Sequence, residues 1–191
     1  MKIGEKITND EAMRLAIEVA SEGRGFVSPN PLVGCVILDS DNKLLSTGAH
    51  LKFGEAHAEI NAIKNVSDQV KFNGATFFVT LEPCAHKGKT GSCAEAISAL
   101  PIKKVYFGIL DPNPLVAGKG IEIIKNAGIE AEQLTHFNKE IETLTEQFLY
   151  HIKNERPFVS LKAGVSLDGK IALNSGESQW ITCEESRLHG R

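Results

Sequence analysis

The sequence contains no apolar run long enough to cross a bilayer, and its first residues do not form a signal-peptide pattern. Only four cysteines occur in 191 residues, and two of them have the spacing of metal ligands, which argues against a secreted disulfide scaffold. An excess of positive charge is also lacking, because the formal net charge of −3 gives no general attraction to nucleic acid. These absences predict a cytoplasmic protein without a membrane or nucleic-acid partner.

The elements predicted from hydrophobic periodicity alternate between strand and helix after an opening hairpin. The predicted strands cover residues 33–38, 44–49, 75–81, 104–110 and 129–134. The predicted helices cover residues 9–22, 57–66, 93–100, 118–126 and 137–154. This alternation predicts an α/β fold of three layers, in which a mixed central sheet lies between two layers of helices. Functional residues are expected where strands lead into helices.

Arg156-Pro157 interrupts this pattern. We divide the chain into a domain at residues 1–152 and, at residues 153–191, a linker with a short fragment of a second α/β domain. Two strands are expected in the fragment around a Leu167-Asp168-Gly169 turn, followed by a helix at residues 184–188. The 35 residues from Pro157 onward are too few for an independent core.

Two short segments, Ala56–Glu59 and Glu82–Cys93, offer one imidazole, two thiols and one spare carboxylate. His57, Cys84 and Cys93 would leave the fourth position of a tetrahedral zinc ion open for water, as in catalytic zinc sites. Glu59 follows His57 by two residues, so on the first turn of a helix its carboxylate can reach that water. His-x-Glu followed by Pro-Cys is typical of zinc-dependent nucleobase deaminases.

A second interpretation is that the cysteines are buried thiols that pack as small apolar residues. Eight residues separate Cys84 from Cys93, whereas the usual signature has two, which indicates either a variant loop or a different second thiol ligand. The Pro, Gly, Ser, Lys and His residues around these thiols are atypical of a core and favour the zinc site. Cys35, in an apolar strand, and Cys183, near the C-terminal end, are not expected to be ligands.

Such a site can deaminate a heterocycle. Zinc makes hydroxide available near neutral pH, and the hydroxide can attack an amino-bearing ring carbon. Glu59 would take the proton of the water and pass it first to a ring nitrogen and then to the leaving amine. His86 and Lys89, between the two cysteines, are either solvated loop residues or donors to an anionic substrate group, with Lys89 as a phosphate contact.

Several motifs resemble the bifunctional deaminase–reductase family of riboflavin biosynthesis. In the first part of the chain they are Ser28-Pro-Asn-Pro-Leu-Val-Gly34, His57-Ala-Glu59, Thr80-Leu-Glu-Pro-Cys-Ala-His86 with Cys93, and Asp111-Pro-Asn-Pro-Leu-Val-Ala-Gly-Lys-Gly120. In the last part, Ser166-Leu-Asp-Gly169 and Gly176-Glu-Ser-Gln-Trp-Ile-Thr182 resemble the opening of the family's reductase domain. The resemblance runs from about Glu11 to the end of the chain, and this family also has the long spacing between its zinc cysteines.

The resemblance implies a cytidine-deaminase-like fold and a zinc-dependent deaminase. The family converts 2,5-diamino-6-(5-phosphoribosylamino)pyrimidin-4(3H)-one to 5-amino-6-(5-phosphoribosylamino)uracil. By resemblance, Glu59 is catalytic and the zinc ligands are His57, Cys84 and Cys93. The substrate-side residues implied are Asn30, His50, His86, Lys89, Asp111, Asn113 and, in the reductase segment, Ser178. Gly164 and Trp180 match positions beside the NADPH cofactor of the reductase.

Two other functions remain open at this point: a deaminase of another nucleoside or of tRNA adenosine, and a zinc-stabilised binding module without turnover. Since the sequence stops early in the reductase segment, we expect NADPH-dependent reduction to be absent, because a dinucleotide cleft needs a whole domain. Unpaired strand edges in residues 158–191 favour a homodimer.

Overall fold

The computed structural model describes residues 1–86, 91–113 and 117–189. Contacts between Cα atoms divide the chain into two units, Met1–Pro157 and Phe158–Arg191. The linker that we predict to begin at residue 153 would start inside the last turn of helix α6, Glu146–Asn154, and that domain boundary stays a prediction.

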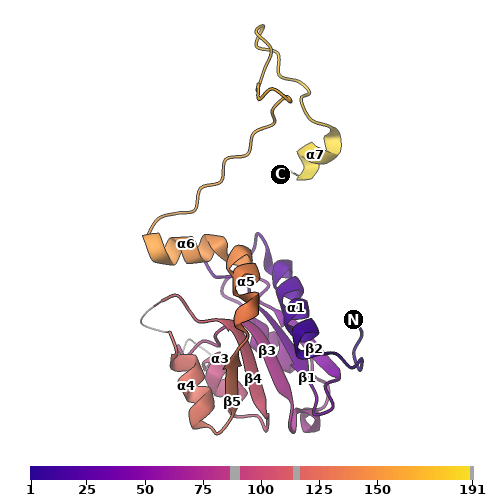
Figure 1. The fold of residues 1–191 in the computed structure, drawn as a ribbon, viewed down its shortest axis with the longest axis vertical. Coiled ribbons are helices and arrows are strands. Elements are labelled where there is room, and N and C mark those ends of the chain that lie inside the picture. The colour runs from indigo at the N-terminus through magenta and orange to yellow at the C-terminus, as the bar shows by residue number, and fades with distance from the viewer. Residues whose placement is uncertain (87–90, 114–116, 190–191) are drawn as a thin grey trace. The chain divides into compact units, whose positions relative to one another are not determined.

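The first unit is built on a five-stranded mixed sheet with the order β2-β1-β3-β4-β5 (Figure 1). The strands are β1 Gly34–Leu38, β2 Leu44–Ala49, β3 Thr76–Leu81, β4 Lys104–Ile109 and β5 Glu130–Gln133. Strand β1 pairs antiparallel with both β2 and β3, whereas the β3–β4 and β4–β5 pairs are parallel. The opening hairpin and the mixed sheet predicted from the sequence are therefore confirmed.

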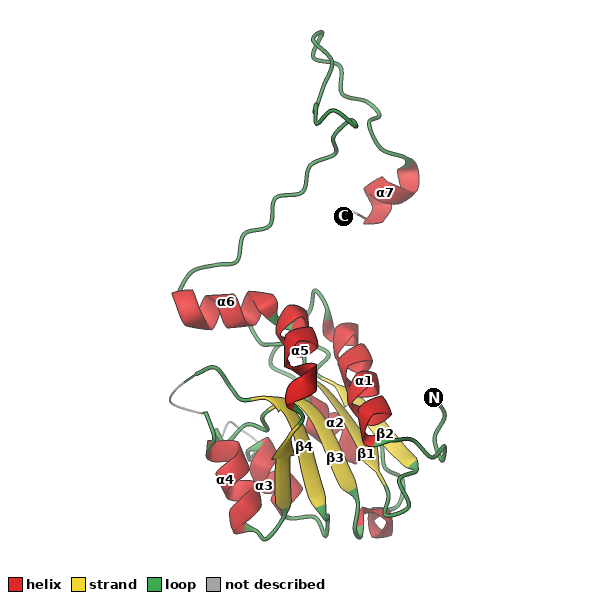
Figure 2. Ribbon diagram, in the orientation of Figure 1, coloured by secondary structure: helices red, strands yellow, loops and turns green. Residues whose placement is uncertain are grey.

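Helices cover both faces of this sheet (Figure 2). Helices α1, Asn9–Ala20, and α5, Asn138–Leu144, lie on one face; α2, Ala58–Lys64, α3, Cys93–Ser98, and α4, Lys119–Asn126, lie on the other. Short 3₁₀ turns occur at Ser21–Gly23, Gln69–Phe72 and Thr135–Phe137. The three-layer architecture is thus as predicted.

The two cores follow from the alternation of side chains along each strand. In β3, Phe78 packs with Met13 and Ile141 in the core under α1 and α5. Its neighbour Phe77 points to the opposite face and joins the core under α2, α3 and α4, with Ala62. Both phenylalanines are fully buried, so β3 holds the two helical layers together.

The single helix predicted at residues 137–154 is wrong, because helix α5 ends at Leu144 and helix α6 begins at Glu146. The buried residue between them, Thr145, donates its hydroxyl to the carbonyl of Ile141 at 2.8 Å. A threonine that hydrogen-bonds one turn back in this way bends a helix, and the two helices run in different directions (Figure 1).

The two strands predicted in the second unit are also wrong: among its described residues the only regular element is helix α7, Glu184–His189. The predicted turn is present, with Gly169 at φ 79° and a Ser166 N–H bond to the Lys170 carbonyl at 2.9 Å. An isolated hairpin is only marginally stable without further strands or a helix to pack on, which explains why the turn forms without strands.

No helix in the described residues is both long and apolar enough to span a membrane.

Candidate active site

Three sequence-predicted ligands come from three element ends. His57 is the N-cap of α2, with extended backbone at φ −72° and ψ 165°. Cys84 follows β3, and Cys93 is the first residue of α3. A capping box between Ser92 and Glu95 sets the start of α3, and the Ala94 N–H bonds to the Cys84 carbonyl at 3.1 Å. These local bonds bring the two cysteines together across their eight-residue spacing.

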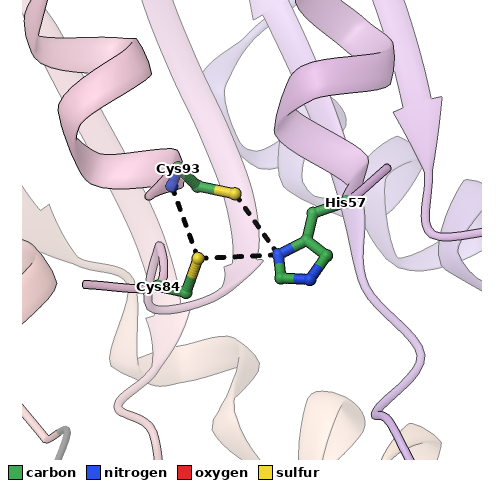
Figure 3. Close-up of side chains that lie close together, drawn as sticks. All are labelled: His57, Cys84 and Cys93. Carbon is green, nitrogen blue, oxygen red and sulfur yellow. Dashed lines mark hydrogen bonds between the residues drawn. The ribbon is translucent and has the colours of Figure 1, made fainter. Parts of the chain in front are cut away.

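The three side chains converge on one point (Figure 3). His57 Nδ1 lies 3.3 Å from Cys93 Sγ and 3.6 Å from Cys84 Sγ, and the three potential ligand atoms all lie within 4.8 Å of one another. A tetrahedral zinc ion with bonds of about 2.3 Å to sulfur and about 2.0 Å to nitrogen separates those atoms by about 3.5 Å. The donor set and its spacing therefore fit zinc, and the alternative of two thiols simply packed in a core does not explain the imidazole between them.

The ionisation of the two thiols is coupled. The hydrogen bond from the Cys93 thiol, with help from His57, lowers the pKa of Cys84 to about 4 despite its partial burial. The Cys84 thiolate and burial in turn hold the pKa of Cys93 far above its usual range. The hydrogen bond with Cys84 also raises the pKa of His57. The protein side chains alone thus share a proton among them, and a bound cation would displace it.

Glu59 lies beside these ligands but is not one of the converging atoms. It is in the first turn of α2 and only 3% exposed. Burial raises the pKa of its carboxyl to about 7, and its interactions include the Cys93 thiol. A carboxyl group that is neither firmly ionised nor firmly protonated near neutral pH is suited to accepting and returning a proton.

Asn30 and His50 form a hydrogen-bonded pair next to the cluster. His50 Nδ1 lies 3.1 Å from the Ala56 carbonyl, which can only accept, so the proton is on Nδ1. His50 Nε2 must then accept from Asn30 Nδ2 at 3.1 Å, and this orients the amide of Asn30. His50 is only 2% exposed and its ring lies edge-on to His57, with centroids 5.3 Å apart. Its burial lowers its pKa and favours the neutral ring that this arrangement needs.

Asp111 and Asn113 follow strand β4 at the same edge of the sheet and are half-buried. The Asn113 N–H donates to Asp111 Oδ1 at 2.8 Å. Burial raises the pKa of Asp111, and the negative charges of Glu82 and Cys84 add to that effect. The negative charge of Cys84 therefore affects the pKa of a residue that follows β4, as expected when two neighbouring strands end at the same edge of the sheet.

The other predicted residues are placed differently. His86 is exposed, and Lys89 lies outside the described residues. Gly164, Ser178 and Trp180 belong to the second unit and are all exposed. Cys35 is fully buried in β1 and Cys183 is exposed; neither belongs to the metal-ligand cluster found in the described residues.

Glu82 lies within the Thr80–His86 motif, but the sequence alone indicates no role for it. This side chain is 4% exposed, and its carboxylate accepts backbone N–H bonds from four residues: Asp111, Gly118, Gly120 and Ile121. The sequence signal was an acidic residue between an apolar strand and Pro83-Cys84. Its partners could not be inferred, because backbone N–H groups have no sequence signature.

Comparison with known proteins places this site in a family. The model of the "cytidine and deoxycytidylate deaminase zinc-binding region" matches residues 6–109, and that of the RibD C-terminal domain matches residues 157–190. The riboflavin biosynthesis protein RibD of Bacillus amyloliquefaciens is 48% identical over 176 residues, which are 92% of this chain and 46% of that protein. The chain thus spans about half the length of the curated relatives it matches.

Solved structures agree with this placement. A diaminohydroxyphosphoribosylaminopyrimidine deaminase/5-amino-6-(5-phosphoribosylamino)uracil reductase from Thermotoga maritima superposes with a TM-score of 0.87 at 42% identity, over 95% of this chain and 52% of that one. RibD from Acinetobacter baumannii gives a TM-score of 0.84 at 46% identity, over 94% and 49% of the two chains. The resemblance to the riboflavin deaminase–reductases is therefore confirmed, and the chain belongs to the cytidine and deoxycytidylate deaminase zinc-binding family.

Proposed function

We propose that this chain is a zinc-dependent deaminase that converts 2,5-diamino-6-(5-phosphoribosylamino)pyrimidin-4(3H)-one to 5-amino-6-(5-phosphoribosylamino)uracil. The observation that carries the proposal is the convergence of one imidazole and two thiols beside a buried carboxyl group that takes no part in the cluster. The similarity to a Thermotoga maritima protein named for this deaminase, and to proteins named for riboflavin biosynthesis, supports the choice of substrate.

His57, Cys84 and Cys93 would hold the ion through Nδ1 and the two sulfur atoms. Zinc bound there would supply a Lewis acid that makes water nucleophilic near neutral pH. The protein prepares this site by partial ionisation of the thiol pair and by placing Cys84 and Cys93 in mutual hydrogen-bond contact, with the Cys93 N–H 3.4 Å from Cys84 Sγ.

Glu59 would carry the protons. Its carboxylate takes a proton from the attacking water and delivers it to the ring nitrogen beside the 2-amino carbon. It then takes the remaining proton from the added hydroxyl group and gives it to the amino group, which leaves as ammonia while the hydroxyl carbon becomes a carbonyl. One carboxylate is enough because the transfers are sequential, and its burial keeps bulk water from competing for the protons.

The substrate ring would contact Asn30, Asp111 and Asn113. His50 would orient Asn30 and would not contact the substrate itself. Its Nε2 accepts a hydrogen bond from the side-chain amide nitrogen of Asn30, which directs the amide oxygen of Asn30 to the substrate. We keep His86 and Lys89 as candidates for the phosphoribosyl side, with Lys89 as a phosphate contact.

The test is ammonia release from the phosphoribosylated pyrimidine, compared with release from cytidine and from tRNA. We expect turnover with the first substrate and little with the others. Activity confined to cytidine or tRNA would overturn the substrate assignment, and zinc binding without any turnover would instead favour a binding module.

We also infer that this chain does not carry out the NADPH-dependent reduction. Gly164, Ser178 and Trp180 are exposed, and helix α7 is the only regular element among the described residues of their unit, which supports this inference. A homodimer, a cytoplasmic location and the absence of a nucleic-acid partner stay predictions.

A further inference from the structure

The carboxylate of Glu82 connects the zinc-ligand segment to the substrate side of the site. Glu82 lies two residues before Cys84, at the end of β3, and its carboxylate is buried. The carboxylate accepts four hydrogen bonds, all from backbone N–H groups that follow strand β4 or lie at the start of helix α4. No side chain of the described residues is among these partners.

The four bonds are divided between the two carboxylate oxygens. Oε2 accepts from Asp111 at 3.2 Å and from Gly118 at 2.9 Å, and Oε1 accepts from Gly120 at 2.9 Å and from Ile121 at 3.4 Å. Oε2 therefore links the residue after β4 to the N-cap of α4, and Oε1 holds the first turn of α4. Only a carboxylate offers acceptors on both oxygens, because an amide replaces one of them with a donor.

Gly120 gives independent evidence that this contact requires close approach. A Cβ atom at residue 120 would lie 1.8 Å from the Pro83 carbonyl oxygen and 3.2 Å from Glu82 Oε1. Any side chain there would push helix α4 away from the segment that precedes Cys84. The missing side chain at Gly120 and the buried carboxylate of Glu82 thus together form the junction between the segment that precedes Cys84 and helix α4.

Asp111 connects this junction to the substrate side of the site. Its N–H donates to Glu82, and its side chain accepts from the Asn113 N–H at 2.8 Å. The position of both substrate-side residues therefore depends on the Glu82 carboxylate. The ligands His57 and Cys93 do not depend on it in the same way, because they are set by α2 and α3.

We propose that Glu82 is a positioning residue for substrate binding, which holds Asp111 and Asn113 at a defined distance from the zinc-ligand segment. This inference rests on the proposed deaminase function for its kinetic consequence, but not for its structural one. It predicts that loss of the carboxylate weakens substrate binding while the metal site stays intact.

The experiment compares the 191-residue chain with Glu82→Gln and, as the matched control, with Glu122→Gln, which changes an exposed glutamate in the first turn of helix α4. We expect Glu82→Gln to keep one zinc per chain and to raise KM for the phosphoribosylated pyrimidine about tenfold or more, with a smaller change in kcat. The control should match the parent in zinc content, KM and kcat.

Hydrogen exchange supplies a readout that does not need activity. In Glu82→Gln the amides of Asp111, Gly118, Gly120 and Ile121 should exchange faster, whereas those of α2 and α3 should be unchanged. If the parent does not deaminate this substrate, the proposed function fails, and the exchange pattern still decides the role of Glu82.

Loss of zinc together with KM unchanged, or exchange that rises equally throughout the first unit, would overturn the proposal. If Glu82→Gln does not fold, Glu82→Asp and Gly120→Ala decide in its place. The first shortens the carboxylate and the second displaces α4 with the carboxylate still present. Either should raise KM with zinc retained; unchanged KM in both would refute the positioning role.

Discussion

The units Met1–Pro157 and Phe158–Arg191 both contain aliphatic and aromatic residues, but among the described residues only those of the first unit form a buried core. Phe77 and Phe78 are fully buried in the first unit, whereas Leu161 is 95% exposed in the second. The first unit has a sheet with helices on both faces, so each apolar side chain has a layer to pack against. The described part of the second has one short helix and turns. Apolar composition thus becomes a core only where enough chain surrounds it.

The largest expected difference between the two units is the effect of a glutamate substitution on kcat. Glu59→Gln should reduce kcat by about 10²- to 10⁴-fold, because it removes the group that moves both protons. Zinc content should stay at one ion per chain, since Glu59 is not among the converging ligand atoms. Steady-state ammonia release and metal analysis measure both quantities.

Glu177→Gln is the control, because it makes the same chemical change at an exposed residue of the second unit. Its kcat should equal that of the parent. Loss of zinc in Glu59→Gln would make this residue a ligand and would contradict the proton-transfer role.

Truncation of one apolar side chain in each unit tests the difference in burial directly. Phe78→Ala should lower the free energy of unfolding by about 3–5 kcal/mol, because it opens a cavity in the core under α1 and α5. Leu167→Ala should change it by less than about 0.5 kcal/mol, because the Leu167 side chain is fully exposed. Urea unfolding of both variants measures the difference, and a large effect of Leu167→Ala would show that the second unit is packed in solution.

Metal removal should act on the first unit alone. Extraction of zinc with a chelator should abolish ammonia release and lower the free energy of unfolding by about 3 kcal/mol, the stabilisation expected when free zinc exceeds its Kd about a hundredfold. Amide exchange should increase around His57, Cys84 and Cys93 and should not change in residues 158–189. Full activity in a protein shown to be metal-free would contradict the zinc site.

The smallest expected effect is that of NADPH. Calorimetric titration should show no saturable micromolar binding, because Gly164 and Trp180 are exposed, whereas a dinucleotide site must enclose its ligand. The deaminated product should likewise cause no oxidation of NADPH. Saturable binding with hydride transfer would show that residues 158–191 form a more complete site than the described structure contains.

Much of the first unit could be predicted because its sequence patterns are local. All five strands were placed within one residue of their observed ends, since each is a short apolar run bounded by turn residues. The helix predicted at residues 137–154 failed because the bend depends on where the Thr145 hydroxyl finds its acceptor. The strands predicted in the second unit failed because strand formation depends on partners outside the segment.

The sequence by itself determined which reactive groups are present. His57, Cys84 and Cys93 form a ligand set typical of catalytic zinc, and Glu59 lies two residues after the imidazole of His57. The sequence also determined the order of strands and helices, because hydrophobic periodicity and turn residues act over a few positions. Only the tertiary structure decided which groups meet. The four backbone N–H groups on Glu82 and the neutral His50 behind Asn30 are contacts between segments up to 39 residues apart, and such contacts exist only after the sheet and its helices have packed.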